Sequence, residues 1–187
     1  MKISEAEILI VPGYKNSAND HWQSRWQAKL STARRIKQDD WLKPDVNEWV
    51  TSLISEVDAS TKPLILIAHS LGSQVVIQAT EKMTDSQLRK IAGAFLVAPP
   101  DVENPKIRPK HLMTFGPYPR DPLPFPSVVV ASTNDPFCDA NVAGEMANCW
   151  GSLFIESGEH GHIDTASGHG PWPEGLMVFA EFMKRLG

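Results

Sequence analysis

The chain contains a serine, an aspartate and a histidine whose types and order fit the cleavage of an acyl bond. Ser70 lies in the segment LILIAHSLGS, where an aliphatic run ends in a short polar turn. A serine hydroxyl is a weak nucleophile at neutral pH, so a catalytic serine needs a nearby base and a group that orients that base. Backbone donors must also stabilise the oxyanion that forms. His162 and Asp135 are the candidates for the base and its orienting group.

The residues around Ser70 predict a sharp turn between a strand and a helix. In the G-x-S-x-G pattern of such turns, Gly72 takes the place of the second glycine and Ala68 stands where the first is expected. The backbone N–H of Leu71, at the start of the helix, would then face a developing oxyanion. A serine that only caps the helix fits the same five residues. The local pattern therefore leaves two interpretations of Ser70 open.

Asp135 and His162 follow two later apolar runs, in the order that a serine hydrolase of this architecture requires. Asp135 comes after the run 127–131, and His162 comes after the run 152–156. In such sheets the nucleophile comes first, the acid follows a later strand and the histidine follows the last strand. The carboxyl ends of parallel strands meet at one edge of the sheet. The three side chains are therefore expected at one place, which favours the nucleophile interpretation.

The elements that must position these residues are predicted by an alternation of short apolar runs with segments of helical period. The runs occupy residues 8–11, 64–67, 94–98, 128–131 and 153–155, with a weaker candidate at 34–37. Helices are expected at residues 20–30, 46–57, 71–80, 140–149 and 174–186. None of the runs alternates polar with apolar residues, so the strands should be buried on both faces. We expect a three-layer α/β fold with about six mostly parallel strands, helices on both faces and no large lid domain.

One segment, residues 99–126, breaks this rhythm. It is rich in proline, which forbids a long regular helix, and we expect an extended loop that could act as a flap over the site. No repeat and no linker divides the chain, and its 187 residues fit a single domain over residues 1–187. Pocket shape depends on this segment, so the sequence does not define the substrate.

Composition excludes several classes of function. A net charge of −4 with scattered Lys and Arg gives no basic face for nucleic acid. No run approaches the ~18 apolar residues of a membrane span, and the N-terminus lacks the layout of a signal peptide, so we expect a cytoplasmic protein without membrane association. The chain has two cysteines, Cys138 and Cys149, which are expected to be free thiols packed as small hydrophobes.

Motifs spread over nearly the whole chain resemble a small serine-hydrolase family of the α/β-hydrolase superfamily, the group that includes the retinoblastoma-binding serine hydrolase. They are ILIVPGY, HWQSRW, LIAHSLGS, FLVAPPD, VVVASTNDPFCD, GHID and WPEG, in the order of the family. Two residues depart from the common pattern. Ala68 replaces the first glycine of the elbow, and Pro12 stands where many α/β-hydrolases have a histidine before the glycine. Both departures bear on the geometry of the oxyanion hole.

The resemblance implies a role for each candidate residue. Ser70 is then the nucleophile, His162 the general base and Asp135 the residue that orients it. The oxyanion donors that the resemblance implies are the backbone N–H groups of Leu71 and Tyr14. This chemistry cleaves a small ester or related acyl substrate through an acyl-enzyme and requires no cofactor or metal.

A competing interpretation of the histidine loop is a metal site. His160, His162 and Asp164 spell H-x-H-x-D, which resembles the start of the zinc-binding motif in some hydrolases. Such motifs usually continue with another histidine, where this chain has Thr165. His169 is then the one remaining downstream histidine that could complete a ligand set. A metal-dependent hydrolase is therefore the minor alternative.

Other residues could take over single roles. His160 and His169 are rival bases, and Asp139 is a rival for orienting the base, although it is expected to cap the following helix. His69 is expected to point into packing rather than toward substrate.

The segment that follows the first strand offers a further choice. His21 could line a substrate pocket together with Trp22 and Trp26. For the two tryptophans we favour the interpretation that they form the buried stripe of a short helix.

A second class of function is a binding module that holds a protein partner on a hydrolase fold with vestigial activity. Fold and motif do not fix the biological role. An intact serine, aspartate and histidine set favours retained chemistry. The short chain leaves little room for an inserted lid, so small or extended acyl substrates are expected.

Overall fold

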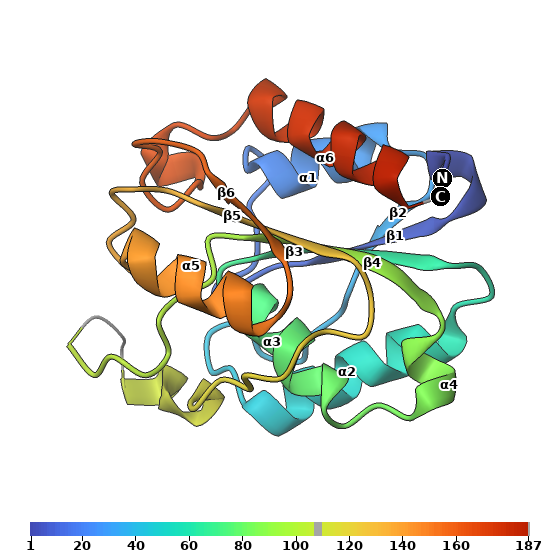
Figure 1. The fold of residues 1–187 in the computed structure, drawn as a ribbon, viewed down its shortest axis with the longest axis horizontal. Helices are drawn as coiled ribbons and strands as arrows, with labels where there is room; N and C mark the ends of the chain where they lie inside the picture. Colours follow the sequence, from blue (N-terminus) through green and yellow to red (C-terminus); the bar gives the residue numbers. More distant parts are fainter. Residues whose placement is uncertain (107–109, 187) are drawn as a thin grey trace.

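The chain forms a six-stranded, entirely parallel sheet between two layers of helices in a computed structural model that describes residues 1–106 and 110–186 (Figure 1). The strands are β1 (Glu7–Val11), β2 (Ala33–Arg35), β3 (Leu64–His69), β4 (Ile91–Val97), β5 (Ser127–Ala131) and β6 (Leu153–Glu156). Their order across the sheet is β2-β1-β3-β4-β5-β6. The predicted architecture is confirmed, and the weak candidate at 34–37 is the edge strand β2.

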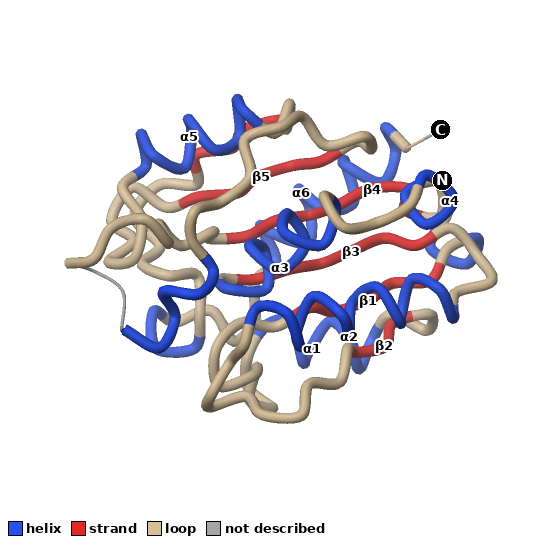
Figure 2. The backbone as a smooth tube through the Cα atoms, turned by 90° about the horizontal axis from the view of Figure 1, so that it is seen from below, coloured by secondary structure: helices blue, strands red, loops and turns tan. Residues whose placement is uncertain are grey.

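Helices cover both faces of the sheet. One face carries α1 (Trp22–Lys29) and α6 (Pro173–Arg185), and the opposite face carries α2 (Val46–Ala59), α3 (Leu71–Thr80) and α5 (Ala140–Cys149). Figure 2 shows the strands lying side by side behind α2, α3 and α5. The structure adds the short helix α4 (Asp85–Leu88) and three 3₁₀ turns, η1 (Ile3–Glu5), η2 (Lys110–Phe115) and η3 (Thr165–Ser167). The five long helices are those that the sequence predicts.

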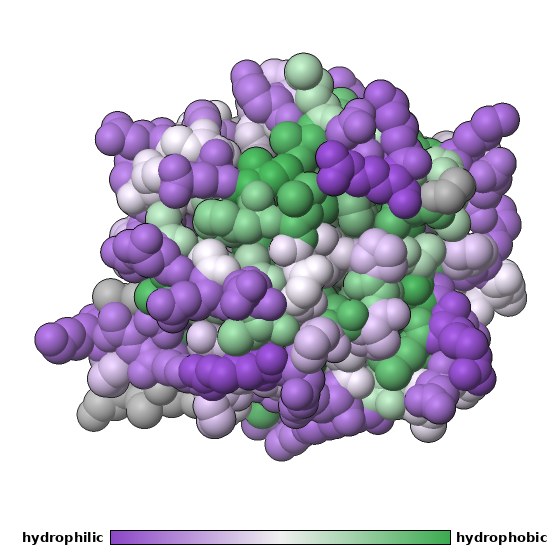
Figure 3. All heavy atoms as spheres, in the orientation of Figure 1, coloured by the Kyte–Doolittle hydropathy of each residue, from purple (hydrophilic) through white to green (hydrophobic). Residues whose placement is uncertain are grey.

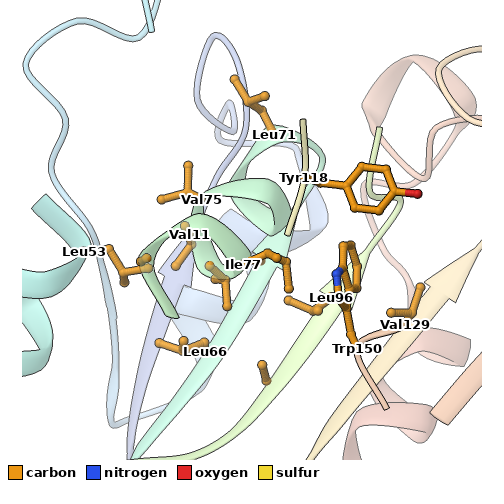
Figure 4. Close-up of a cluster of buried hydrophobic side chains, with 14 of the residues drawn as sticks. Val11, Leu53, Leu66, Leu71, Val75, Ile77, Leu96, Tyr118, Val129 and Trp150 are labelled. Carbon is orange, nitrogen blue, oxygen red and sulfur yellow. The ribbon is translucent and has the colours of Figure 1, made fainter. Parts of the chain in front are cut away.

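The central strands lack polar–apolar alternation because helices cover both of their faces. The prediction is wrong for the edge strand β6, which has no buried residue and whose Leu153 is 43% exposed, because an edge strand has only one neighbouring strand. All six residues of β3 are buried. Leu66 packs into the cluster beneath α2 and α3, whereas Ile65 and Ile67 pack beneath α1 and α6. Figure 4 shows the first of these clusters, in which Leu66 and Leu96 of the sheet lie below α3. Burial on both faces stabilises the central strands by roughly 25 cal/mol per Å² of apolar surface.

The strand order creates a switch point at the centre of the sheet. From β1 the chain moves outward to β2, and it then returns to place β3 on the other side of β1. Connections that leave neighbouring strands in opposite directions open a crevice at the carboxyl ends of the strands. Residues 12–21 follow β1 at this edge, and Ser70 follows β3. The fold therefore brings both segments to the place where ligands bind in open α/β sheets.

The proline-rich segment is more ordered than the expected extended loop. It contains η2, and Phe115 is fully buried against Trp49 of α2, with 5.9 Å between the ring centroids. Gln78 of α3 donates from Nε2 to the carbonyl oxygens of Phe115 and Pro117, at 3.2 and 2.9 Å. The part of the predicted loop at residues 107–109 lies outside the described residues. The described part is anchored to α2 and α3, and its residues Pro100, Asp101, Val102 and Leu112 line the cavity described below.

No helix within the described residues is both long enough and apolar enough to cross a membrane. The face in Figure 3 is largely polar, with apolar residues gathered between α6 and β6. Leu153, Leu176 and Met177 are among the exposed large apolar side chains. None of the three lines the cavity described below.

Candidate active site

Ser70 forms a strained turn between β3 and α3. Its φ of 55° and ψ of −128° lie in a region that residues other than glycine rarely adopt. Its N–H donates to the carbonyl oxygen of Val97 at 2.9 Å, which ties the turn to β4. The hydroxyl makes no capping hydrogen bond to α3. The helix-cap interpretation of Ser70 is therefore wrong, and the backbone has the conformation of a nucleophile elbow.

Two glycines allow the segment after β1 to approach this turn closely. A Cβ atom on Gly72 would lie 2.2 Å from the carbonyl oxygen of Val11, and a Cβ on Gly13 would lie 2.8 Å from Cβ of Ser70. Ala68, in place of the first elbow glycine, is paired with Val11 of β1 and has its methyl group buried in the core. The turn thus forms with alanine at that position, and the close approach depends on Gly13 and Gly72.

His162 lies between Ser70 and Asp135. Its Nε2 is 2.7 Å from Oγ of Ser70, and its Nδ1 is 3.0 and 2.9 Å from the two carboxylate oxygens of Asp135. Both side chains are shielded, with 9% of His162 and 3% of Asp135 exposed. The carboxylate can only accept, so Nδ1 carries the proton in the neutral ring and Nε2 is free to accept the Ser70 hydroxyl proton. The structure brings the three predicted residues together in one hydrogen-bonded chain.

Two side chains from other elements hold the backbone at His162. His69 donates from Nε2 to the carbonyl oxygen of His162 at 2.9 Å. Trp22 donates from Nε1 to the carbonyl oxygen of Ile163 at 2.9 Å. His69 is thus a positioning residue, buried as expected, although it also borders the cavity described below. The indole of Trp22 has a structural bond that the sequence does not indicate.

Two polar side chains after β5 hold the loop just before His162. Oγ of Ser132 accepts from the N–H of His160 at 2.9 Å, and Oδ1 of Asn134 accepts from the N–H of Gly161 at 2.7 Å. Ser132 also donates to Oδ1 of Asn134 at 2.8 Å. These contacts fix the histidine loop against the aspartate loop. Neither residue is among those that the sequence predicts.

Burial keeps two other histidines uncharged. Desolvation by burial lowers the pKa of His69 well below its ordinary value, and the neighbouring His162 and His21 lower it further. Burial likewise lowers the pKa of His21 to about 4, against an opposing effect of the Asp164 carboxylate. Both rings are therefore neutral at pH 7, and each has one donor nitrogen and one acceptor nitrogen.

The neutral state of His21 predicts that the fold loses stability as the pH falls from 7 towards 4. Its pKa is about 4 in the folded chain, against the ordinary value of 6.5. Within this window the unfolded chain binds a proton that the folded chain does not, so the free energy of unfolding falls with decreasing pH. Between pH 7 and pH 5 the loss due to His21 is about 2 kcal/mol. Urea unfolding at the two pH values measures it.

The variant His21→Ser is the control for this prediction. A serine can still cap α1 but has no group that titrates in this range. The drop in the free energy of unfolding between pH 7 and pH 5 should therefore be smaller by about 2 kcal/mol, while the contribution of His69 remains in both proteins. An equal drop in both proteins would show that His21 is not responsible.

The residues of the H-x-H-x-D motif do not form a ligand set. His162 is engaged by the two contacts described above, and Nδ1 of His160 lies 3.1 Å from Nε2 of His169. Oδ1 of Asp164 accepts from the N–H of Ser167 at 2.9 Å. Among the described residues, no three His, Cys, Asp or Glu side chains are arranged to hold a metal ion. The residues of the motif thus bond to different partners, and it is His162, not His160 or His169, that lies beside Ser70.

Asp139 and Cys138, near the same edge, have structural roles. Oδ1 of Asp139 accepts from the N–H of Asn141 at 2.8 Å and caps α5, as predicted. Cys138 is buried, and this burial raises the pKa of its thiol to about 12, so the thiol stays protonated. Cys138 and Cys149 are both free thiols. The aspartate that contacts His162 is therefore Asp135.

A cavity of about 500 Å³ opens beside Ser70. Both expected oxyanion donors, Leu71 and Tyr14, contribute to its lining. The other lining residues are Gly13, Lys15, Asn16, Ala18, His21, His69, Ser70, Pro100, Asp101, Val102, Leu112, Phe137, His162, Asp164, Thr165 and Ala166. Trp22 and Trp26 are buried in the core beneath α1 and α6 and do not line the cavity, which confirms the stripe interpretation. A cavity of this size fits a small-molecule ligand.

A parallel sheet with a strained serine turn after β3 and a histidine loop after the last strand defines the class of α/β-hydrolases. Residues 8–181 match the sequence model of the family described as serine hydrolase. The chain belongs to this serine hydrolase family.

Individual relatives agree with this assignment. YdeN of Bacillus subtilis (strain 168), which carries the name of a hydrolase, is 27% identical over 96 residues, a match that spans 49% of this chain and 48% of YdeN. A YdeN-like hydrolase from Pectobacterium atrosepticum SCRI1043 has a crystal structure with a TM-score of 0.85 and 33% identity, covering 98% of this chain and 94% of the other. The esterase RhEst1 from Rhodococcus sp. ECU1013 shares the fold, with a TM-score of 0.69 and 14% identity over 100% of this chain and 93% of its own.

Proposed function

We propose that this serine hydrolase cleaves small carboxylic esters through an acyl-enzyme on Ser70. The observation that carries the proposal is the hydrogen-bonded chain from Asp135 through His162 to Ser70 beside the cavity. The strained backbone of Ser70 supports it, because strain at a serine elbow exposes the hydroxyl for attack. The esterase RhEst1 shares the fold at 14% identity and serves as a fold-level analogy only, so the site geometry carries the proposal.

The reaction begins when His162 Nε2 accepts the proton of the Ser70 hydroxyl as Oγ forms a bond to the ester carbonyl carbon. The carbonyl π electrons move to the oxygen, which becomes an oxyanion that the N–H groups of Leu71 and Tyr14 stabilise. Asp135 holds the ring in the tautomer with Nδ1 protonated and stabilises the imidazolium. The oxyanion then collapses, the bond to the alcohol oxygen breaks and His162 transfers its proton to the departing alcohol. Water then loses a proton to His162 and attacks the acyl carbonyl carbon, the bond from this carbon to Oγ of Ser70 breaks, and Oγ takes the proton back from His162 as the acid leaves.

The cavity favours compact substrates. Its volume is about 500 Å³, and its lining includes the apolar side chains of Val102, Leu112 and Phe137, which can contact an acyl chain or a small alcohol. The described residues insert no helical domain above it. Short-chain esters therefore fit better than long-chain lipids, which need an enclosed tunnel.

A fluorophosphonate probe that labels active serines tests the proposal directly. We expect stoichiometric labelling of the wild-type protein, located at Ser70 by peptide mass analysis, because the base lies within 2.7 Å of the hydroxyl. The variant Ser70→Ala should show no labelling. Labelling that persists in Ser70→Ala would refute the role of Ser70 as the nucleophile. Absence of labelling from the wild type would refute the proposed chemistry and favour the alternative of a protein-binding module.

A further inference from the structure

His21 points a hydrogen-bond donor toward the cavity. Its Nδ1 accepts from the N–H of Gln23 at 3.1 Å and so caps α1. A neutral imidazole whose Nδ1 accepts must carry its proton on Nε2. The residue is 6% exposed and lines the cavity. Within residues 1–106 and 110–186, the backbone N–H of His21 donates to the carbonyl oxygen of Ala18, but no group accepts from its Nε2–H, which is free for a ligand.

His21 lies on the side of the cavity that His162 occupies. The ring centroids of His21 and His69 are 4.9 Å apart, and those of His69 and His162 are also 4.9 Å apart. His69 already uses its own Nε2–H on the carbonyl oxygen of His162. The ring of His69 thus contacts both other rings, and His21 is the one of the three whose ring donor has no protein partner in the described chain.

Asp164 supplies an acceptor on the same side. Its Oδ1 accepts from the N–H and the hydroxyl of Ser167 at 2.9 and 3.0 Å. Its Oδ2 makes no hydrogen bond to any residue that the structure describes. Asp164 lines the cavity, and its charge opposes the burial of His21 by raising the pKa of that ring. A donor and an acceptor thus stand near each other without bonding to each other.

This part of the cavity is where the alcohol portion of an ester would lie. His162 must transfer a proton to the alcohol oxygen when the ester bond breaks, so the alcohol lies beside its Nε2. The rings of Phe137 and His69 contact that of His162, with centroids 4.6 and 4.9 Å away, and His21 and residues 164–166 line the same cavity. Val102 and Leu112 supply apolar lining from the proline-rich segment. A polar alcohol would therefore find partners on the histidine side.

We propose that His21 and Asp164 form a subsite for a hydroxyl group on the alcohol portion, so that the preferred substrates are esters of polyols or sugars. A hydroxyl can accept from Nε2–H of His21 and donate to Oδ2 of Asp164 at the same time. An alkyl ester without hydroxyl groups leaves both side chains without a partner, which lowers its kcat/KM relative to that of the hydroxylated ester. This inference rests on the proposed function of Ser70.

Two esters with the same carbon skeleton test it: 2,3-dihydroxypropyl acetate and propyl acetate. The ratio of their kcat/KM values, measured by acid release, should favour the dihydroxy ester by about tenfold or more in the wild type. His21→Ser keeps the cap of α1 but is too short to reach the hydroxyl, and it should bring the ratio to within about twofold of unity. Asp164→Asn presents a donor where an acceptor is needed and should lower the ratio similarly.

Asp20→Asn is the matched control. Asp20 is exposed, precedes His21 and acts on it by charge, but it does not line the cavity. The ratio should stay at the wild-type value in this variant. If His21→Ser does not fold, as judged by circular dichroism, Asp164→Asn carries the same test.

The outcomes separate this inference from the proposed function. A wild-type ratio near unity, with turnover that Ser70→Ala abolishes, overturns the subsite and leaves the esterase intact. A high ratio that survives both His21→Ser and Asp164→Asn also overturns the subsite. Turnover that persists in Ser70→Ala overturns the proposed function itself, whatever the ratio.

Discussion

Replacing His162 with alanine is expected to lower kcat for p-nitrophenyl acetate by about 10⁴- to 10⁶-fold, and Ser70→Ala should do the same. The two side chains are 2.7 Å apart and act in one proton transfer. Without the base, the hydroxyl stays a weak nucleophile, and without the hydroxyl, the base has nothing to activate. The double variant should therefore be no slower than either single variant. Steady-state kinetics, corrected for the uncatalysed hydrolysis of the ester, measure all three variants.

The control for this experiment is Asp139→Asn. Asp139 lies near the same edge but caps α5, and asparagine caps helices as well as aspartate does. Its kcat should stay within about twofold of the wild type. A double variant whose loss equals the product of the two single losses would mean that Ser70 and His162 act independently, and the proposed mechanism would fail.

The positions of the candidate site residues could be predicted because each follows an apolar strand. Ser70, Asp135 and His162 come after β3, β5 and β6, and parallel strands bring these ends together whatever the loops contain. Ser132 and Asn134 could not be predicted in the same way. They hold backbone N–H groups 28 and 27 residues further along the chain, and such contacts leave no periodic trace in the sequence.

The fold was predictable where burial determines the pattern and less so elsewhere. The helix α2 shows a clear stripe, and Trp49, Val50, Leu53 and Val57 are indeed its buried residues. By contrast, α4 has four residues, none of them buried, so it has no stripe to detect. The turn η2 lies in a proline-rich segment and is fixed by the burial of Phe115 rather than by local propensity. The turn η2 thus depends on tertiary contacts, whereas α4 starts with a local capping box between Thr84 and Gln87.

Gly72→Ala is expected to destabilise the fold by about 3 kcal/mol or more. The added Cβ would lie 2.2 Å from the carbonyl oxygen of Val11 and 2.7 Å from that of Pro12. Both atoms belong to the backbone at the end of β1, so relief requires α3 to move away from the sheet. Because α3 begins directly after Ser70, this movement would also carry Ser70 and Leu71 away from Tyr14 and lower kcat. Urea unfolding gives the stability, and ester hydrolysis gives the second effect.

Gly144→Ala in α5 is the matched control, because it makes the same chemical change without the clash. Its added Cβ would lie 3.6 Å from the ring of Phe154, which is an ordinary contact. Alanine in a helix interior is favoured over glycine by about 1 kcal/mol, so this variant should be slightly more stable than the wild type. If Gly72→Ala loses less than about 1 kcal/mol and keeps its kcat, the tight packing of the elbow against β1 is not what supports the site. Ala68 then fits the same logic: the elbow accepts a methyl group that faces the core and rejects one that faces the end of β1.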